Sequence, residues 1–279
     1  METESKHQND PRPVDKMITD PELRKIARER KLRLDIVEKD YALGWILIGI
    51  YNSSLSNSLL FKGGTALSKI YFPFNWRISE DLDFTLSENS IMEDMPDKLS
   101  DELPGIVEDL SDGLVLDFKE EPYINPGFSR VRVQFNGPIS KNTVKIEFTK
   151  ENFIGDFELV TVSQTYDYPE YNALSYTLEN IFSEKLRSLI ERTKIRDYYD
   201  SWRLLEVTAI DLENAKSLFY RKCKAREIVF NNVQQFFPEN LVETLEPYLY
   251  TLTRLTAEPL PPLRDLIQEL KTSLEIMFQ

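Results

Sequence analysis

The spacing of apolar residues changes near residue 170, from mixed patterns before it to a helical period after it. Short apolar or alternating segments predict β-strands that begin at Leu59 and Asp81 and others at 114–118, 129–135 and 143–149. Helical spacing predicts helices at about 21–30, 34–52 and 65–71, and an acidic helical segment within 88–111. Together these elements predict a mixed α/β (α+β) core over residues 21–169.

Beyond residue 170 the apolar residues recur every 3.6 positions, which predicts helices over 177–205, 212–229, 238–255 and 262–278. We therefore expect a helical C-terminal domain at 170–279. Residues 1–20 are mostly polar and predict a disordered tail. No stretch has the roughly 20 apolar residues that a membrane-spanning helix needs, so we expect a soluble protein with no membrane partner.

The chain has one cysteine and one histidine, His7, so the sequence excludes an intrachain disulfide, a zinc cluster and histidine-based catalysis. These counts favour the cytoplasm and leave carboxylates, lysine, arginine and metal as catalytic groups. The net charge of −13 disfavours a broad nucleic-acid footprint. Residues 183–226 nevertheless carry 11 Lys and Arg against 7 Asp and Glu. The basic side chains within 216–226 form either a solvated helix face or a contact to RNA phosphates.

A glycine pair and two alternating carboxylates lie close together in the sequence. Gly63 and Gly64 follow an apolar strand and precede the predicted helix 65–71, whose free N–H groups could hold an anion. Asp81 and Asp83 alternate with apolar residues, so on a strand they share the face opposite the core. Two carboxylates on one face repel unless a cation lies between them. The combination suggests a nucleotide site with bound Mg²⁺.

Glu147 is a candidate third carboxylate. In 144–148 the apolar residues face the core, and Lys145 and Glu147 point the other way. If this strand neighbours the Asp81 strand, Glu147 completes the metal site and helps to deprotonate an attacking hydroxyl. The alternative is an ordinary surface strand face with a Lys–Glu pair.

The predicted helix 177–193 carries two cations on its apolar side. At about 100° per residue, Lys185 and Arg192 fall inside the apolar arc. The polar side holds Glu184, Arg187 and Glu191. Because an isolated buried charge is costly, these cations need an anion: a nucleotide triphosphate, or a carboxylate such as Asp197 or Asp200. The side chains could instead extend to solvent at the rim of the core.

Asp197 and Asp200 lie three residues apart, on one face of a helix. This spacing places Arg196 next to Asp200 as a partner. We expect Asp197 to belong to the site and Asp200 to support it.

The ordered set of motifs resembles the AbiEii/AbiGii toxin family of nucleotidyltransferases. The resemblance covers about residues 35–205 and rests on Val37-Glu38-Lys39-Asp40-Tyr41, Lys62-Gly63-Gly64-Thr65-Ala66-Leu67, Arg77-x-Ser79-Glu80-Asp81-Leu82-Asp83, Glu184-Lys185-Leu186 and Arg192-x-x-x-Arg196-Asp197-x-x-Asp200. It implies a polymerase-β-like nucleotidyltransferase core. It also implies transfer of a nucleoside monophosphate from an NTP to RNA, often the 3′ end of a tRNA, with Mg²⁺ or Mn²⁺. A separately encoded antitoxin would be the partner.

The resemblance also implies roles for individual residues. Asp81 and Asp83 would be metal ligands, and Asp197 an essential acidic residue. The nucleotide would be held by Lys62, Gly63, Gly64, Thr65, Ser79, Lys185 and Arg192. Two features depart from the wider superfamily: Gly-Gly-Thr replaces the usual Gly-Ser, and Asp81 follows Gly64 at a longer distance. The missing serine leaves Thr65 or backbone N–H groups for the γ-phosphate.

Three other functions share parts of this pattern. The same site could nucleotidylate a protein hydroxyl, because the metal chemistry does not depend on the acceptor. An interaction module could keep the fold without activity, although Asp81, Asp83 and Glu147 argue against it. A metal nuclease would need the carboxylates but neither the glycine turn nor Lys185. The sequence leaves open the preferred NTP, the acceptor, the number of nucleotides added and the oligomeric state.

Overall fold

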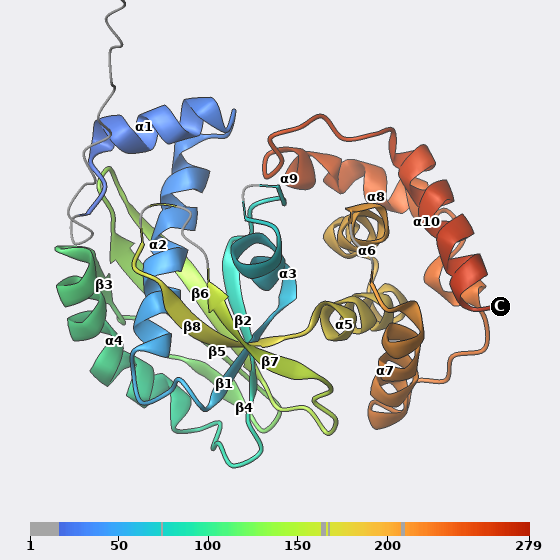
Figure 1. Cartoon of the computed structure of the whole chain (residues 1–279), viewed down its shortest axis with the longest axis horizontal. Coiled ribbons are helices and arrows are strands. Elements are labelled where there is room, and N and C mark those ends of the chain that lie inside the picture. The colour runs from blue at the N-terminus through green and yellow to red at the C-terminus, as the bar shows by residue number, and fades with distance from the viewer. Residues whose placement is uncertain (1–16, 74, 163–165, 167, 208–209) are drawn as a thin grey trace, which may run out of the picture.

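The computed structural model describes residues 17–73, 75–162, 166, 168–207 and 210–279 of the 279-residue chain. Its strands are β1 (Leu59–Lys62), β2 (Asp81–Leu86), β3 (Val115–Asp117), β4 (Tyr123–Asn125), β5 (Phe128–Asn136), β6 (Lys141–Thr149), β7 (Phe157–Val162) and β8 (Tyr171–Tyr176). The helices of the first part are α1 (Asp20–Glu29), α2 (Leu34–Tyr51), α3 (Gly63–Ala66), the π-helical turn η1 (Leu67–Tyr71) and α4 (Met95–Ser111) (Figure 1). The C-terminal helices are α5 (Leu178–Glu191), α6 (Ile195–Val207), α7 (Leu212–Ala225), η2 (Val233–Phe236), α8 (Leu241–Leu245), η3 (Glu246–Tyr248), α9 (Leu249–Thr253) and α10 (Leu263–Met277).

The strands form one mixed sheet in the order β3-β5-β6-β2-β1-β8-β7, with β4 paired to β5. At its centre, β2 pairs antiparallel with β1 and parallel with β6. The predicted mixed α/β fold is therefore confirmed. Strands β4, β7 and β8 were not predicted. Strand β8 lies beyond residue 169, yet it pairs parallel with β1, so the sheet takes in part of the segment that the apolar spacing grouped with the C-terminal helices.

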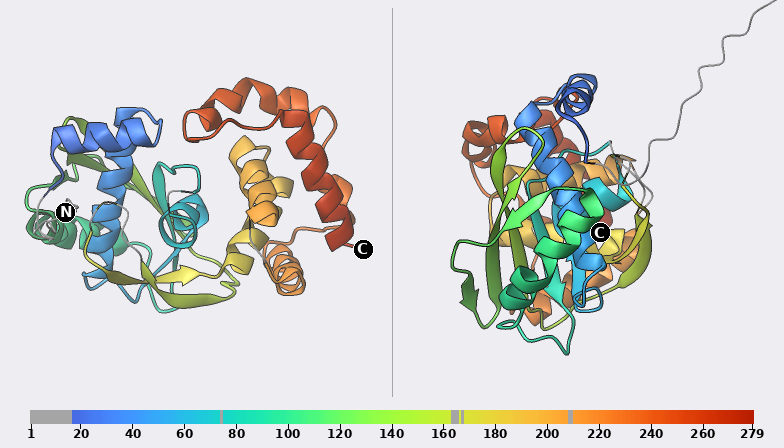
Figure 2. Two further views of the ribbon diagram at one scale, coloured as in Figure 1. Left: turned by 45° about the horizontal axis from the view of Figure 1, so that its top comes forward. Right: turned by 90° about the vertical axis from the view of Figure 1, so that its left-hand side faces the viewer.

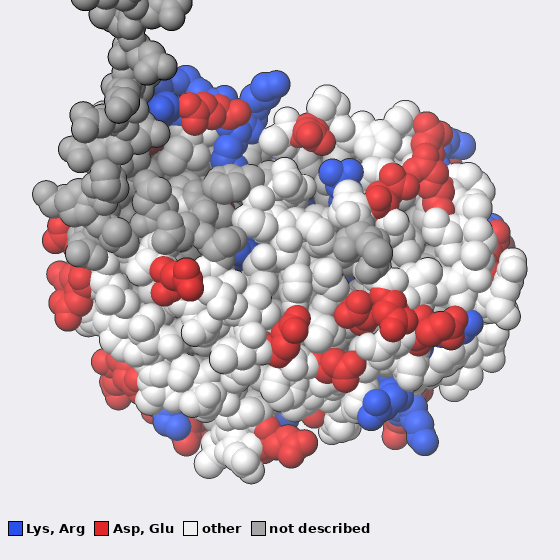
Figure 3. All heavy atoms as spheres, viewed as in Figure 1, with Lys and Arg blue, Asp and Glu red and all other residues white. Residues whose placement is uncertain are grey.

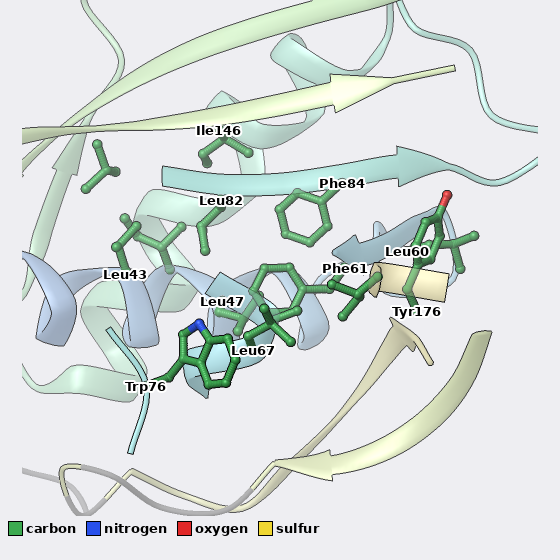
Figure 4. Packing of buried hydrophobic residues seen from close by; sticks show 14 of the residues in the cluster. Leu43, Leu47, Leu60, Phe61, Leu67, Trp76, Leu82, Phe84, Ile146 and Tyr176 are labelled. Atoms are coloured by element: carbon green, nitrogen blue, oxygen red, sulfur yellow. The ribbon is translucent and has the colours of Figure 1, made fainter. Parts of the chain in front are cut away.

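The core lies between the sheet and α2. Leu82, Phe84 and Ile146 are buried on one face of the sheet. Figure 4 shows Leu43 of α2 near Leu82, and Leu47 of α2 near Phe61 of β1. Because α2 lies between the sheet and α4, apolar residues surround it on almost every side. The face of β2 and β6 away from this core is free for polar residues.

The C-terminal helices form a lobe beside the sheet, in which α5 packs against α6 and α7, and α6 against α10 (Figures 1 and 2). The helical spacing predicted through 177–205 corresponds to two helices: α5 ends at Glu191, close to the end of the predicted helix 177–193, and α6 begins at Ile195. The helix predicted over 238–255 is a series of short turns. Pro247, which has no N–H to donate, lies at the start of η3 within this series.

The predicted tail over 1–20 lies mostly outside the described residues, which begin at residue 17. Within the described part, Ile18 is buried and its backbone N–H donates to the Tyr41 hydroxyl at 3.1 Å. Met17 and Ile18 are therefore packed on the core, and α1 starts at Asp20.

Candidate active site

The helix after β1 begins at the first glycine of the pair. The sequence predicted a turn at Gly63 and Gly64 with the helix starting at Thr65, whereas α3 begins at Gly63. Gly63 has φ +76°, and a Cβ there would lie 2.7 Å from Asp83 Oδ2. Only glycine allows this backbone to pass so close to the carboxylate.

The second glycine is equally constrained. A Cβ on Gly64 would lie 2.6 Å from Nη2 of Arg77, a buried side chain that cannot move aside because Asp200 holds it. The Thr65 hydroxyl donates to the carbonyl oxygen of Asp81. Thr65 is fully buried, and its predicted contact with a γ-phosphate stays a prediction, since its hydroxyl here joins α3 to β2.

The three predicted carboxylates lie on adjacent strands. Strands β2 and β6 are parallel, with Asp83 opposite Glu147 and Asp81 opposite Lys145. The condition set for Glu147, that its strand neighbours the Asp81 strand, is met. Burial, together with the charges of Glu147 and Asp81, raises the pKa of Asp83 to about 6, although Lys62 opposes the rise. The carboxylates therefore repel one another across this face of the sheet.

Basic side chains neutralise two of these carboxylates. Arg130 Nε lies 2.7 Å from Glu147 Oε1, and Lys145 Nζ lies 3.8 Å from Asp81 Oδ1. Within the described ranges, no three His, Cys, Asp or Glu side chains are grouped so as to hold a metal ion. The donor set still fits one: carboxylate oxygens are the ligands that Mg²⁺ and Mn²⁺ prefer, and the raised pKa of Asp83 reflects a crowding that a cation would relieve.

Lys185 is buried, as the helical spacing predicted, and two carboxylates hold it. Its Nζ lies 3.0 Å from Asp197 Oδ1 and 2.8 Å from Asp200 Oδ2. Burial alone would raise the pKa values of these carboxyls, but Lys185 and two arginines outweigh it and hold both values below the usual range. The arginines are Arg192, 2.8 Å from Asp197, and Arg77, 2.6 Å from Asp200.

Two expectations for this region were wrong. Arg192 does not lie on the buried side of a helix: it follows the last residue of α5, and its side chain is 49% exposed. Arg196 pairs with Glu80 at 2.8 Å rather than with Asp200. The first error arises because α5 ends at Glu191, so Arg192 is not part of the helix. The second arises from packing: Asp200 is buried against Arg77 and Lys185, whereas Arg196, on the same helix α6, reaches Glu80.

A second buried ion cluster was missed. Glu184, assigned to the polar side of its helix, is covered by α7 and bonded to Lys62 of β1 at 3.3 Å and Lys222 of α7 at 3.4 Å. Burial opposes ionisation, but these two cations lower the pKa of Glu184 to about 2. Lys222, assigned to a solvated or RNA-binding face, is itself buried. Lys62 also lies 3.6 Å from Glu151. Sequence spacing could not show that α7 covers this face.

Two cavities meet at the glycine pair and the carboxylates. The first, of about 300 Å³, is lined by Lys62, Gly63, Gly64, Asp83, Phe128, Glu147, Thr149, Glu151, Ile181, Glu184, Lys185, Arg187, Ser188, Glu191, Arg192 and Arg226. The second, of about 530 Å³, is lined by Gly64, Arg77, Ser79, Asp81, Asp83, Phe128, Arg130, Lys145, Glu147, Lys185, Arg192, Lys194, Arg196 and Asp197. Every predicted site residue except Thr65 lines at least one of them.

A mixed sheet that places two carboxylates of one strand beside a glycine-started helix, between two cavities, is the arrangement of a nucleotidyltransferase. Comparison with known proteins agrees. Residues 45–269 match the family described as the nucleotidyl transferase AbiEii toxin of type IV toxin–antitoxin systems. The chain belongs to this family and is a nucleotidyltransferase, as the motifs had indicated.

Solved structures share the fold. MenT4, a nucleotidyltransferase toxin from Mycobacterium tuberculosis H37Rv, is 16% identical with a TM-score of 0.73, over 92% of this chain and 89% of that one. JHP933 from Helicobacter pylori is 17% identical with a TM-score of 0.54, over 88% of this chain and 93% of that one. No curated protein matches the sequence.

Proposed function

We propose that this protein is a growth-inhibiting toxin that transfers a nucleoside monophosphate from an NTP to the 3′ end of an RNA, with tRNA as the acceptor, in a reaction that depends on Mg²⁺ or Mn²⁺. The observation that carries the proposal is the pair of cavities that share Gly64, Asp83, Glu147, Lys185 and Arg192. A transferase must bring a donor and an acceptor to one phosphorus atom from two sides, and these cavities meet where the carboxylates lie.

The NTP is assigned to the first cavity, with its phosphates at the shared wall. Gly63 and Gly64 present backbone N–H groups at the start of a helix, which suits an anion. Lys62, Lys185 and Arg192 line the same cavity and add positive charge. A divalent cation, when bound by Asp81, Asp83 and Glu147, would supply charge neutralisation for the triphosphate.

The acceptor is assigned to the second cavity. Its hydroxyl oxygen attacks the α-phosphorus, a P–O bond to the acceptor forms, the bond to the β-phosphate oxygen breaks and pyrophosphate leaves. The proton of the hydroxyl passes to Glu147, which lines both cavities. Asp197 holds Lys185 and Arg192 in position at the wall between the two substrates.

The charge of the second cavity supports RNA as the acceptor. Seven Lys and Arg side chains line it against four Asp and Glu, although the whole chain has a net charge of −13. On the face shown in Figure 3, acidic side chains are widely spread, and many of the basic ones gather over α1. Positive charge lining a cavity of an acidic protein suits a local contact to a phosphate backbone.

The family supports two further parts of the proposal. A type IV toxin has a cognate antitoxin, which we expect to be the partner that limits the activity of this chain. The cytoplasm, where RNA and NTPs occur together, is the proposed location. No helix in the described part of the chain is both long and apolar enough to cross a membrane.

The test is incubation of the purified protein with total cellular RNA, Mg²⁺ and each of the four α-³²P-labelled NTPs, with RNA and protein resolved separately. We expect label in a discrete RNA band with one preferred NTP. The label should be lost with Asp81→Ala or with chelator and kept with Asp109→Ala, a matched change at an exposed position on α4. Induction of the wild-type gene, but not of Asp81→Ala, should arrest growth.

Three results would redirect the assignment. Label on protein instead of RNA would make a protein hydroxyl the acceptor. Full activity of Asp81→Ala would remove the carboxylate assignment. The lack of any thermal stabilisation by Mg²⁺ with each NTP would favour a binding module over an enzyme.

A further inference from the structure

A third cavity lies beside the second one, in the C-terminal lobe. Its volume is about 430 Å³, within the range of about 300–1,000 Å³ typical of small-molecule sites. The start of α6 forms one side, and α8, η3 and α9 form the other. It is lined by Thr193, Lys194, Ile195, Arg196, Thr244, Tyr248 and Thr251.

We propose that this cavity binds the unpaired nucleotide at the 3′ end of the RNA acceptor, with its base stacked on Tyr248. The inference rests on the proposed function and adds to it a recognition site for the acceptor end.

The order of the three cavities supports this occupant. Lys194 and Arg196 line both the second and the third cavity, so the two cavities adjoin at these residues. The first and third cavities have no described lining residue in common. The carboxylates and the glycine pair therefore lie between the third cavity and the proposed NTP position. A nucleotide in the third cavity would therefore lie on the acceptor side of the carboxylates.

The lining chemistry suits an unpaired nucleotide. Tyr248 is 56% exposed, which leaves its ring available for stacking, and aromatic stacking accepts any base. The hydroxyl oxygens of Thr244 and Thr251 can accept hydrogen bonds from base amino groups. Among the described residues, the charged members of the lining are two cations, Lys194 and Arg196, which suit the flanking phosphates.

The wall between the second and third cavities is held in place by ion pairs. Arg196 Nη2 lies 2.8 Å from Glu80 Oε2, and Arg254 Nη2 lies 2.6 Å from Glu80 Oε1. The Ile78 N–H donates to the Leu255 carbonyl at 2.9 Å. These contacts join the segment before β2 to α6 and to the end of α9. The proposed base site is thereby fixed relative to the carboxylate strand, as precise positioning of an acceptor end requires.

The test is RNA binding measured by fluorescence anisotropy, without NTP or metal. Two probes are compared: a labelled RNA hairpin with four unpaired nucleotides at its 3′ end, and the same hairpin with a blunt end. Tyr248→Ala should weaken binding of the first probe about 10-fold, within the about 5- to 150-fold that one stacked base contributes. Binding of the blunt hairpin should not change. Tyr248→Phe, which keeps the ring, should bind both probes like the wild type.

Tyr250→Ala is the matched control, because Tyr250 is 70% exposed and does not line the cavity. Equal binding of the unpaired-end probe by Tyr248→Ala and Tyr250→Ala would overturn the inference, as would an equal loss on both probes. If the wild type binds and labels RNA while Tyr248→Ala matches it, only this inference fails. If the wild type binds neither probe and labels protein instead, the proposed function fails, and the inference fails with it.

Discussion

Replacement of Asp83 by asparagine should make the protein more stable at neutral pH while removing its activity. The pKa of Asp83 is raised from 3.8 to about 6 by burial and by the charges of Glu147 and Asp81. At about 1.4 kcal/mol per unit, this rise of about 2 units corresponds to about 3 kcal/mol as an upper value. Asparagine has a similar shape and carries no charge, so Asp83→Asn removes the destabilisation that the ionised carboxylate causes at neutral pH.

The pH dependence has a definite sign. In the unfolded chain Asp83 loses its proton near pH 3.8, whereas the folded protein keeps it up to about pH 6. The folded state therefore binds more protons in this window, and its free energy of unfolding falls as the pH rises through it. The full contribution is present below pH 3.8 and is lost above about pH 6.

The assay is urea unfolding of the wild type and of Asp83→Asn at intervals from pH 4 to pH 8 in metal-free buffer. The stability gain of the variant should be near zero at pH 4 and should rise to a plateau of up to about 3 kcal/mol above pH 6. In thermal scans, each kcal/mol corresponds to about 2–4 °C for a chain of this size. Asp109→Asn, on the exposed side of α4, should show no such trend.

The reasoning would be refuted by a difference that stays constant across the pH range or that grows towards low pH. A further readout separates the carboxylate crowding from a simple burial effect. Added Mg²⁺ should stabilise the wild type more than Asp83→Asn, because a bound cation offsets the repulsion. Equal stabilisation of the two proteins would assign the metal to other groups.

Three further changes test the surrounding structure. Gly63→Ala should lower the free energy of unfolding, measured in urea, by about 1–2 kcal/mol, because alanine is strained at the left-handed backbone of this position. The variant should also lose transfer, because the new Cβ displaces the Asp83 carboxylate; an active variant would contradict this. Asp200→Ala should lower the free energy of unfolding by about 3–5 kcal/mol, because Lys185 and Arg77 then stay buried without this partner. A loss of stability below about 1 kcal/mol would refute this prediction. Glu80→Gln should lower the free energy of unfolding by about 1–2 kcal/mol at pH 7. The difference in stability between this variant and the wild type should shrink below about pH 4.5, because two arginines hold the pKa of Glu80 below its usual value despite burial.

Local sequence patterns were enough to predict on which face of its own strand or helix each of several site residues lies. The alternation in Asp81-Leu82-Asp83-Phe84 set two carboxylates on one strand face, and the same period placed Glu147 on the polar face of its own strand. The helical period placed Lys185 on the buried side of α5. Each of these predictions follows from the fixed repeat of a strand or a helix, which is a property of neighbouring residues.

The tertiary structure decided which elements meet. The pairing of β2 with β6 brought Glu147 opposite Asp83, and α7 covered Glu184, whose partner Lys62 is 122 residues away in the chain. Strand β8 was missed because its pairing with β1 joins residues more than 100 positions apart. No repeat in the sequence encodes such distances.

The same division between sequence and tertiary structure applies to the ion pairs. The sequence determined that Lys185, the predicted buried cation on α5, needed an anion, because an unpaired buried charge is costly. It could not determine that Asp200 would hold Arg77 as well as Lys185, or that Arg196 would bind Glu80. Those choices depend on where helices end and how they pack, and their energies come from contacts between segments that approach only in the folded chain.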